Sequence, residues 1–200
     1  MNNFKIIYLY RHGETNLNVS GITMGQLSSL HTEFTELGYE QIENIKKKII
    51  DNNIEVIYSS DFERTFKTAQ IANTNLPLYS TKKLRGLNMG NYQGHSMDEF
   101  LNSEEAKICF EDHNIKFSNG ESINDLNARI INFIFSVCSS TSYTRIALIT
   151  HSAVISNLYS YLSQNEYYSL NECVLLYQDN KLKILQPDNI KNKTLLKRRK

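Results

Sequence analysis

A short apolar run near the N-terminus ends in three residues suited to phosphate chemistry. Residues 4–10 are predicted to form a buried strand, and Arg11, His12 and Gly13 follow it directly. In open α/β sheets, ligands bind at the carboxyl ends of the strands. Arginine matches the geometry of phosphate, and histidine can act as a covalent nucleophile. This segment therefore favours a sheet protein that performs phosphoryl chemistry.

Two later segments repeat the order of strand, polar residues and helix. A predicted strand at residues 55–59 is followed by Arg64, and a predicted strand at residues 144–150 is followed by His151. If these strands are parallel neighbours of the first one, both side chains meet the N-terminal arginine and histidine at one edge of the sheet. The sequence thus predicts a site that contains two arginines and two histidines.

These four residues together suit a phosphoryl group. Arg11 and Arg64 would donate paired, charge-assisted hydrogen bonds to its oxygens. Their charges disfavour imidazolium, so His12 would stay neutral and nucleophilic. His151, protonated when substrate is bound, would stabilise the transferring group. We expect two steps, in which His12 attacks phosphorus and water then hydrolyses the phosphohistidine.

Alternation of strands and helices along the chain predicts the fold class. It is an α/β, three-layer α/β/α sandwich with a central, mostly parallel sheet. Residues 1–190 are expected to form a single domain, in which residues 81–120 are an insertion that shapes the substrate pocket and contains one helix, about 96–107. Residues 191–200 form a basic tail, predicted to be a solvated end or a weak contact for an anionic partner. The other predicted elements are helices 36–50, 62–73, 122–138 and 152–163, a strand at 76–80 and a hairpin of 173–178 with 182–186.

Composition narrows the function classes. The 200 residues carry a formal net charge of +1, so no overall field favours nucleic acid or a membrane, and neither is an expected partner. No apolar run approaches the roughly 18 residues of a membrane span. Three widely spaced cysteines, Cys109, Cys138 and Cys173, indicate buried reduced thiols and a cytoplasmic location. The histidines show no metal-ligand spacing, so no metal or other cofactor is expected. The oligomeric state is left open.

The order and spacing of these motifs resemble the histidine phosphatase superfamily, which has the phosphoglycerate mutase-like fold. The resemblance covers about residues 4–160. The matching motifs are Arg11-His12-Gly13-Glu14-Thr15-x-x-Asn18, Thr35-Glu36-Leu37-Gly38, Ser59-Ser60-Asp61-x-x-Arg64-Thr65-x-x-Thr68-Ala69, Asn119-Gly120-Glu121-Ser122 and Thr150-His151-Ser152.

The resemblance implies a role for each matching residue. His12 would be the phosphorylated nucleophile, and the phosphate pocket would be formed by Arg11, Arg64 and His151. Contacts with substrate or its loop are implied for four further residues: Asn18, Thr23, Glu14 and Ser152. Among these, Glu14 is expected to orient the loop rather than to react. The family needs no metal for this chemistry.

One departure from the family pattern concerns the general acid. Many members carry a glutamate after Leu-Arg in a segment that here reads Leu84-Arg85-Gly86. General acid catalysis contributes roughly 10²–10⁴-fold, most for alkyl phosphates. Three explanations stay open: a carboxylate such as Asp98 or Glu99 swings in, the substrate needs no acid, as with aryl phosphates, acyl phosphates or phosphohistidine, or the protein is a weak enzyme that mainly binds.

The sequence thus predicts a metal-independent phosphatase that acts on a phosphorylated small molecule or a phosphoprotein. The alternatives are a catalytically weak phosphate-binding family member with a regulatory role, and a phosphoglycerate mutase-type isomerase. Five residues are candidates for the pocket, although ordinary packing is the better interpretation of each: Tyr92, His95, Phe100, His113 and Phe117.

Overall fold

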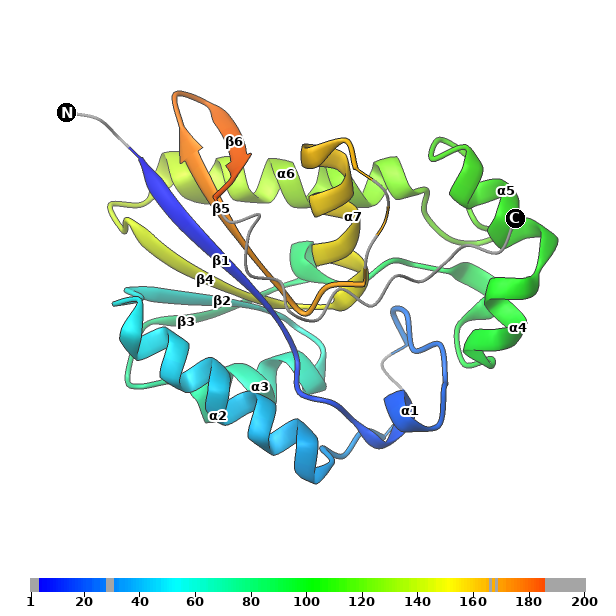
Figure 1. The fold of residues 1–200 in the computed structure, drawn as a ribbon, viewed down its shortest axis with the longest axis horizontal. Helices are drawn as coiled ribbons and strands as arrows, with labels where there is room; N and C mark the ends of the chain where they lie inside the picture. Colours follow the sequence, from blue (N-terminus) through cyan, green and yellow to red (C-terminus); the bar gives the residue numbers. More distant parts are fainter. Residues whose placement is uncertain (1–3, 28–30, 166, 168, 186–200) are drawn as a thin grey trace.

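A six-stranded mixed sheet forms the centre of the molecule (Figure 1). The structure, a computed structural model, describes residues 4–27, 31–165, 167 and 169–185. The strands are β1 (Lys5–Arg11), β2 (Val56–Ser60), β3 (Leu78–Thr81), β4 (Arg145–Thr150), β5 (Glu172–Gln178) and β6 (Lys181–Ile184), in the spatial order β3-β2-β4-β1-β5-β6. Strands β1, β2, β3 and β4 run parallel; β5 pairs antiparallel with β1, and β6 pairs antiparallel with β5. The predicted mostly parallel sheet is confirmed.

Helices cover both faces of this sheet, as the sandwich architecture requires (Figure 1). On one face, α2 and α3 pack against an apolar core, and on the other face α6 and α7 pack against a larger one. The α-helices in the described residues are α1 (Asn16–Val19), α2 (Glu36–Asp51), α3 (Glu63–Ala72), α4 (Met97–Asn102), α5 (Glu104–Glu111), α6 (Ile123–Ser140) and α7 (Ser152–Ser163). Two 3₁₀ turns, η1 (Lys82–Leu84) and η2 (Gly90–Tyr92), lie in the insertion.

The predicted helix α6 follows directly from its sequence pattern. Ser122 and Asp125 form a capping box at its start, with hydrogen bonds of 3.0 and 3.1 Å. Its apolar stripe is buried, at Ile123, Leu126, Ile130 and Ile134, and the last three belong to the larger core. The helix packs on the sheet because every third or fourth side chain is apolar.

The insertion departs from the prediction. Instead of one helix, two short helices meet at Ser103, whose side chain accepts from Ala106 N at 3.1 Å and starts α5. A serine here competes for the backbone donors and breaks the helix.

The helix α1 has no apolar stripe and was not predicted. The basic tail, residues 191–200, lies outside the described residues, so the tail and the domain boundary at residue 190 stay predictions.

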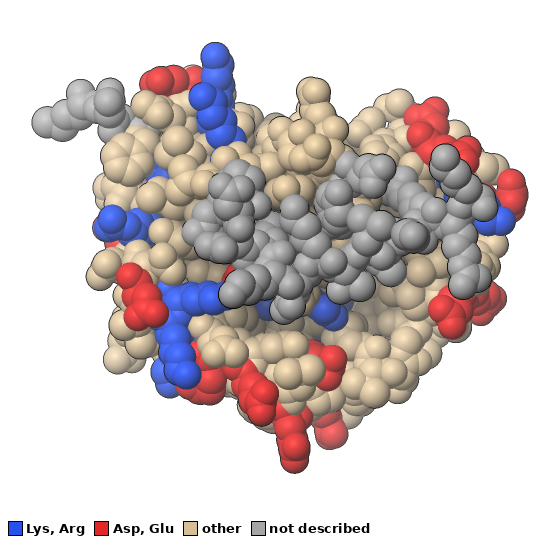
Figure 2. Space-filling model, viewed as in Figure 1, with Lys and Arg blue, Asp and Glu red and all other residues tan. Residues whose placement is uncertain are grey.

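The three cysteines are free and buried, as predicted. In the part of the chain that the structure describes, no helix has both the length and the apolar character to cross a bilayer. On the face drawn in Figure 2, acidic and basic side chains are interspersed.

The loop after β1 lies very close to the start of α2. A Cβ added at Gly13 would lie 2.7 Å from the carbonyl oxygen of Gly38, and a Cβ added at Gly38 would overlap the carbonyl oxygen of Glu14. Both glycines are therefore needed for close approach, and the cap of α2 fixes the loop that carries the strand-end histidine.

We expect Gly38→Ala to lower the free energy of unfolding by about 1–3 kcal/mol, since backbone must shift to relieve the overlap. Urea unfolding measures the change. Leu37→Ala, at the exposed neighbouring position, is the control and should stay close to the parent protein. Equal stability of the two variants would contradict the close approach.

Candidate active site

The carboxyl ends of β1, β2 and β4 bring the predicted site residues together. Arg11 is in register with Thr150, so His12 and His151 each lie one residue beyond neighbouring strands. Their ring centroids are 5.3 Å apart, and Nη2 of Arg64 lies 3.5 Å from Nδ1 of His151. The structure thus places these side chains in one cluster, as the strand pattern predicted.

His12 is held in the form that a nucleophile requires. Its backbone N–H donates to Thr150 O at 3.0 Å, which continues the sheet, and its Nδ1 lies 2.8 Å from Gly13 O. A carbonyl oxygen only accepts, so Nδ1 carries the hydrogen and Nε2 keeps its lone pair. Burial, together with the charges of Arg11 and Arg64, holds the pKa of His12 well below its ordinary value. His12 is therefore neutral at neutral pH.

The two arginines supply positive charge and unused donors. Nη2 of Arg64 donates to Gly25 O at 3.0 Å, and Nη1 of Arg11 donates to the Asn171 side chain at 3.2 Å. The Nε atoms of both arginines are buried and have no hydrogen-bond partner among the described residues. Burial, and then the charge of Arg11, lowers the pKa of Arg64 to about 10, so it stays charged at neutral pH. Buried cationic donors of this kind fit an anion such as phosphate.

His151 is enclosed by polar and aromatic groups. Its Nε2 lies 3.2 Å from Ser60 Oγ, and the Phe62 ring meets it edge-on at 5.9 Å. Phe62 is in turn flanked by two guanidinium groups, those of Arg64 at 4.8 Å and Arg85 at 4.5 Å. Burial, with Arg64 as the largest charge effect, holds the pKa of His151 well below its ordinary value.

Gly86 lies directly against His151. A Cβ at Gly86 would be 3.3 Å from Cγ of His151, a close contact that glycine avoids. The segment before it is tied down because Thr150 Oγ1 donates to Leu84 O at 2.8 Å. The residue after the Leu-Arg pair therefore faces the cluster.

An ion pair anchors the same segment from outside. Nη1 of Arg129, on α6, donates to the carbonyl oxygens of Lys83 and Arg85, both at 2.8 Å, and Nη2 lies 3.2 Å from that of Gly86. Nη2 also pairs with Glu121 at 2.7 Å. Glu121 belongs to a recognised motif, whereas Arg129 showed no signal in the sequence, because its partners are carbonyl groups more than 40 positions away.

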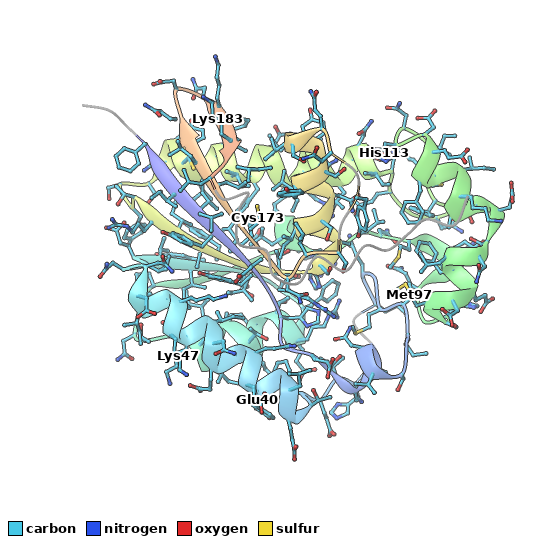
Figure 3. All side chains as sticks on the ribbon, in the orientation of Figure 1. Glu40, Lys47, Met97, His113, Cys173 and Lys183 are labelled. Atoms are coloured by element: carbon cyan, nitrogen blue, oxygen red, sulfur yellow. The ribbon has the colours of Figure 1, made fainter. Side chains whose placement is uncertain are left out.

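The four residues expected to contact substrate have other partners in the structure. Glu14 accepts from Thr35 Oγ1 at 2.9 Å, as a loop-orienting residue does. Asn18 accepts from Thr15 N at 3.0 Å, which closes the turn of α1. Thr23 Oγ1 lies 3.9 Å from Sδ of Met97, which Figure 3 shows on α4. Ser152 donates to the Leu170 carbonyl at 3.1 Å. Contacts of these residues with substrate stay predictions.

The candidate pocket residues of the insertion mostly pack. Phe100 and Phe117 are buried, and their rings lie 5.6 Å apart, with Tyr92 5.4 Å from Phe100. The exposed side chains of His95 and Glu99 face each other at 3.5 Å. The backbone oxygen of the fifth candidate, His113, accepts from Asn124. Within the described residues, no group of three or more His, Cys, Asp or Glu is placed to hold a metal ion.

An α/β sandwich with a neutral histidine and two arginines at the parallel-strand edge defines a class of phosphoryl-binding proteins. The profile of the histidine phosphatase superfamily (branch 1) matches residues 7–195, so the chain belongs to this superfamily.

Named relatives include both mutase-like proteins and phosphatases. Phosphoglycerate mutase-like protein 4 of Arabidopsis thaliana is 29% identical over 166 residues, which are 76% of this chain and 69% of the relative. The phosphoglycerate mutase of Bacillus anthracis superposes with a TM-score of 0.77 at 22% identity and covers 92% of each chain. The alpha-ribazole phosphatase of Shigella flexneri superposes with a TM-score of 0.70 at 23% identity, over 90% of this chain and 94% of that one. These two structures share the fold.

The lowered histidine pKa values predict acid sensitivity. The unfolded histidines take up protons near the ordinary pKa of 6.5, whereas folded His12 and His151 do not. Their contribution to stability is therefore fully present above that pH and lost as the pH falls. We expect a loss of up to about 1.4 kcal/mol per histidine per pH unit below the unfolded pKa.

Urea unfolding between pH 8 and pH 5 tests this dependence. The variant His12→Gln/His151→Gln should show a shallower loss of stability than the parent protein. His31→Gln is the control, because that side chain is 74% exposed, and it should keep the parent slope. The same slope in all three proteins would contradict the assignment of neutral, buried histidines.

Proposed function

We propose that the protein is a phosphatase that hydrolyses phosphate monoesters through a phosphohistidine on His12. One observation carries the proposal: the buried imidazole of His12 presents an unprotonated Nε2 beside two arginines whose Nε donors are unused. A protein that only binds phosphate does not need a neutral histidine with a free Nε2 at this position. The phosphatases among its relatives support the same assignment.

The chemistry has two steps. Nε2 of His12 attacks phosphorus, the P–N bond forms, and the bond from phosphorus to the leaving oxygen breaks. Water then attacks phosphorus, the P–N bond breaks, and inorganic phosphate is released while His12 returns to its starting form. Arg11 and Arg64 stabilise the charge on the phosphoryl oxygens in both steps, and backbone N–H groups at the start of α7 add to this field. No step requires a metal.

Gly86 defines the substrate class. A glycine supplies no proton to the leaving group, so a substrate whose leaving group departs as a stable anion suits this site best. Aryl and acyl phosphates have such leaving groups, whereas an alkoxide needs a proton. We therefore propose a phosphorylated small molecule of this kind as the substrate. If the protein shows no turnover, regulatory phosphate binding is the alternative function. Isomerisation of a phosphoglycerate is disfavoured because it needs the missing acid.

Turnover of para-nitrophenyl phosphate in the presence of a chelator tests the activity. We expect steady release of phosphate by the parent protein, and a loss of about a thousandfold or more in His12→Ala. When a reaction with phosphate-labelled substrate is stopped rapidly without acid, labelled phosphate should be bound to the parent chain and absent from the variant. Turnover that survives His12→Ala, or that the chelator abolishes, would contradict the proposal.

The dependence on the leaving group tests the role of Gly86. We expect kcat/KM for an alkyl phosphate to be about 10²–10⁴-fold below that for para-nitrophenyl phosphate. Comparable rates would mean that another residue supplies the proton. In that case Asp98→Asn and Glu99→Gln identify it, since loss of alkyl turnover in one of them would show that its carboxylate acts as the acid.

A further inference from the structure

Ser60 lies behind His151, on the side away from Arg64. It is the last residue of β2, it is fully buried, and its Oγ is 3.2 Å from Nε2 of His151. The sequence marked Ser60 only as part of a motif. Its contact with a histidine 91 positions away comes from the pairing of β2 with β4.

The donors around the imidazole decide where its hydrogen lies. Arg64 Nη2, 3.5 Å from Nδ1 of His151, can only donate, so Nδ1 presents its lone pair there. The hydrogen of the neutral ring is then on Nε2, and Nε2 donates to Ser60 Oγ. The contact with Arg64 is long and weak. A hydroxyl can donate or accept, so Arg64 sets the tautomer, and Ser60 accepts the Nε2–H that results.

Ser60 is itself held in place from three directions. Its carbonyl oxygen accepts from Ser59 Oγ at 2.7 Å, and Thr65 Oγ1 lies 3.0 Å from the same oxygen and 2.7 Å from the Phe62 carbonyl. Its side-chain oxygen lies 3.5 Å from the backbone N of Phe62. These contacts tie the acceptor to the end of β2 and the start of α3, so its position is set by the fold.

We propose that Ser60 is a positioning residue: its Oγ accepts Nε2–H of His151 and so holds the ring with Nδ1 as the nitrogen that serves the phosphoryl group. The proposal rests on the proposed phosphatase function. When a substrate monoanion binds, its proton moves to Nδ1; the imidazolium then donates Nδ1–H to a phosphoryl oxygen and Nε2–H to Ser60. The proton returns to phosphate when the product leaves. The charged or titratable groups that act on His151 are Arg64, His12, Arg11 and Arg129.

The test compares Ser60→Ala with Ser59→Ala. Both serines are fully buried neighbours on β2, and both variants lose one hydroxyl, but Ser59 donates to a carbonyl and is not the partner of His151. Long-range proton–nitrogen NMR of histidine-labelled protein reports which ring nitrogen carries hydrogen. A His151→Gln variant assigns the signals. Ser60→Cys keeps the size of the side chain with a poor acceptor, and serves if Ser60→Ala does not fold.

We expect His151 to be the Nε2–H tautomer in the parent protein and in Ser59→Ala, with an Nε2–H proton at the downfield shift of a hydrogen-bonded group, and we expect that proton to move upfield in the Ser60 variants. With para-nitrophenyl phosphate, kcat of the Ser60 variants should fall about 3- to 10-fold, with KM within about twofold, as the loss of one hydrogen bond predicts. An unchanged shift of the Nε2–H proton in the Ser60 variants, or an Nδ1–H tautomer in the parent, would overturn the proposal. If the parent has no turnover, the phosphatase function fails, while the tautomer is still measured.

Discussion

Two positively charged arginines lie close together where three parallel strands end, and the rest of this structure depends on that constraint. Arg11 and Arg64 lie near two buried imidazoles; burial lowers the pKa of both histidines most, and the two positive charges lower it further. A buried cation without a counter-charge destabilises the fold. An anion bound between the arginines would remove that cost. Burial and positive charge together also keep His12 neutral, the form in which a histidine can act as a nucleophile. One arrangement thus serves both the proposed phosphate binding and the proposed nucleophile.

The side chains of this cluster keep their positions only if the backbone around them is rigid. Hydrogen bonds from the helices on both faces of the sheet provide that rigidity. Gly13 N donates to Thr68 Oγ1 at 3.1 Å, which fixes the loop after β1 to α3. Thr68 Oγ1 donates in turn to Arg64 O at 2.7 Å, so one hydroxyl connects the loop that carries His12 to the helix that carries Arg64. From the opposite layer, Arg129 on α6 fixes the segment that contains Gly86. Both helical layers thus help to fix the positions of the clustered side chains.

The strands, the long helices and the meeting of His12, Arg64 and His151 were predictable, because periodicity and strand-end position are local signals. The hairpin turn was predictable too: Asp179 and Asn180 have φ of 50° and 55°, which such residues adopt readily. The break between α4 and α5 was missed because an apolar pattern continues across Ser103. The contacts of Ser60 and Arg129 were missed for a different reason. Their partners are distant in sequence, and only the tertiary fold brings these groups together.

Hydrogen bonds to its backbone hold the segment that contains Gly86 beside His151. The carbonyl oxygen of Gly86 still accepts from Gln26 at 2.9 Å, and Thr150 still anchors Leu84, so the segment keeps its place beside His151. Glu121 is already engaged by other groups: its Oε1 accepts from Asn88 N at 2.8 Å, from Arg129 at 2.7 Å and from Gln26 at 3.3 Å. In the proposed mechanism, the site has the groups that bind and attack phosphorus and has no side chain at Gly86 to protonate the leaving oxygen, so the leaving group would be the main determinant of which substrates react.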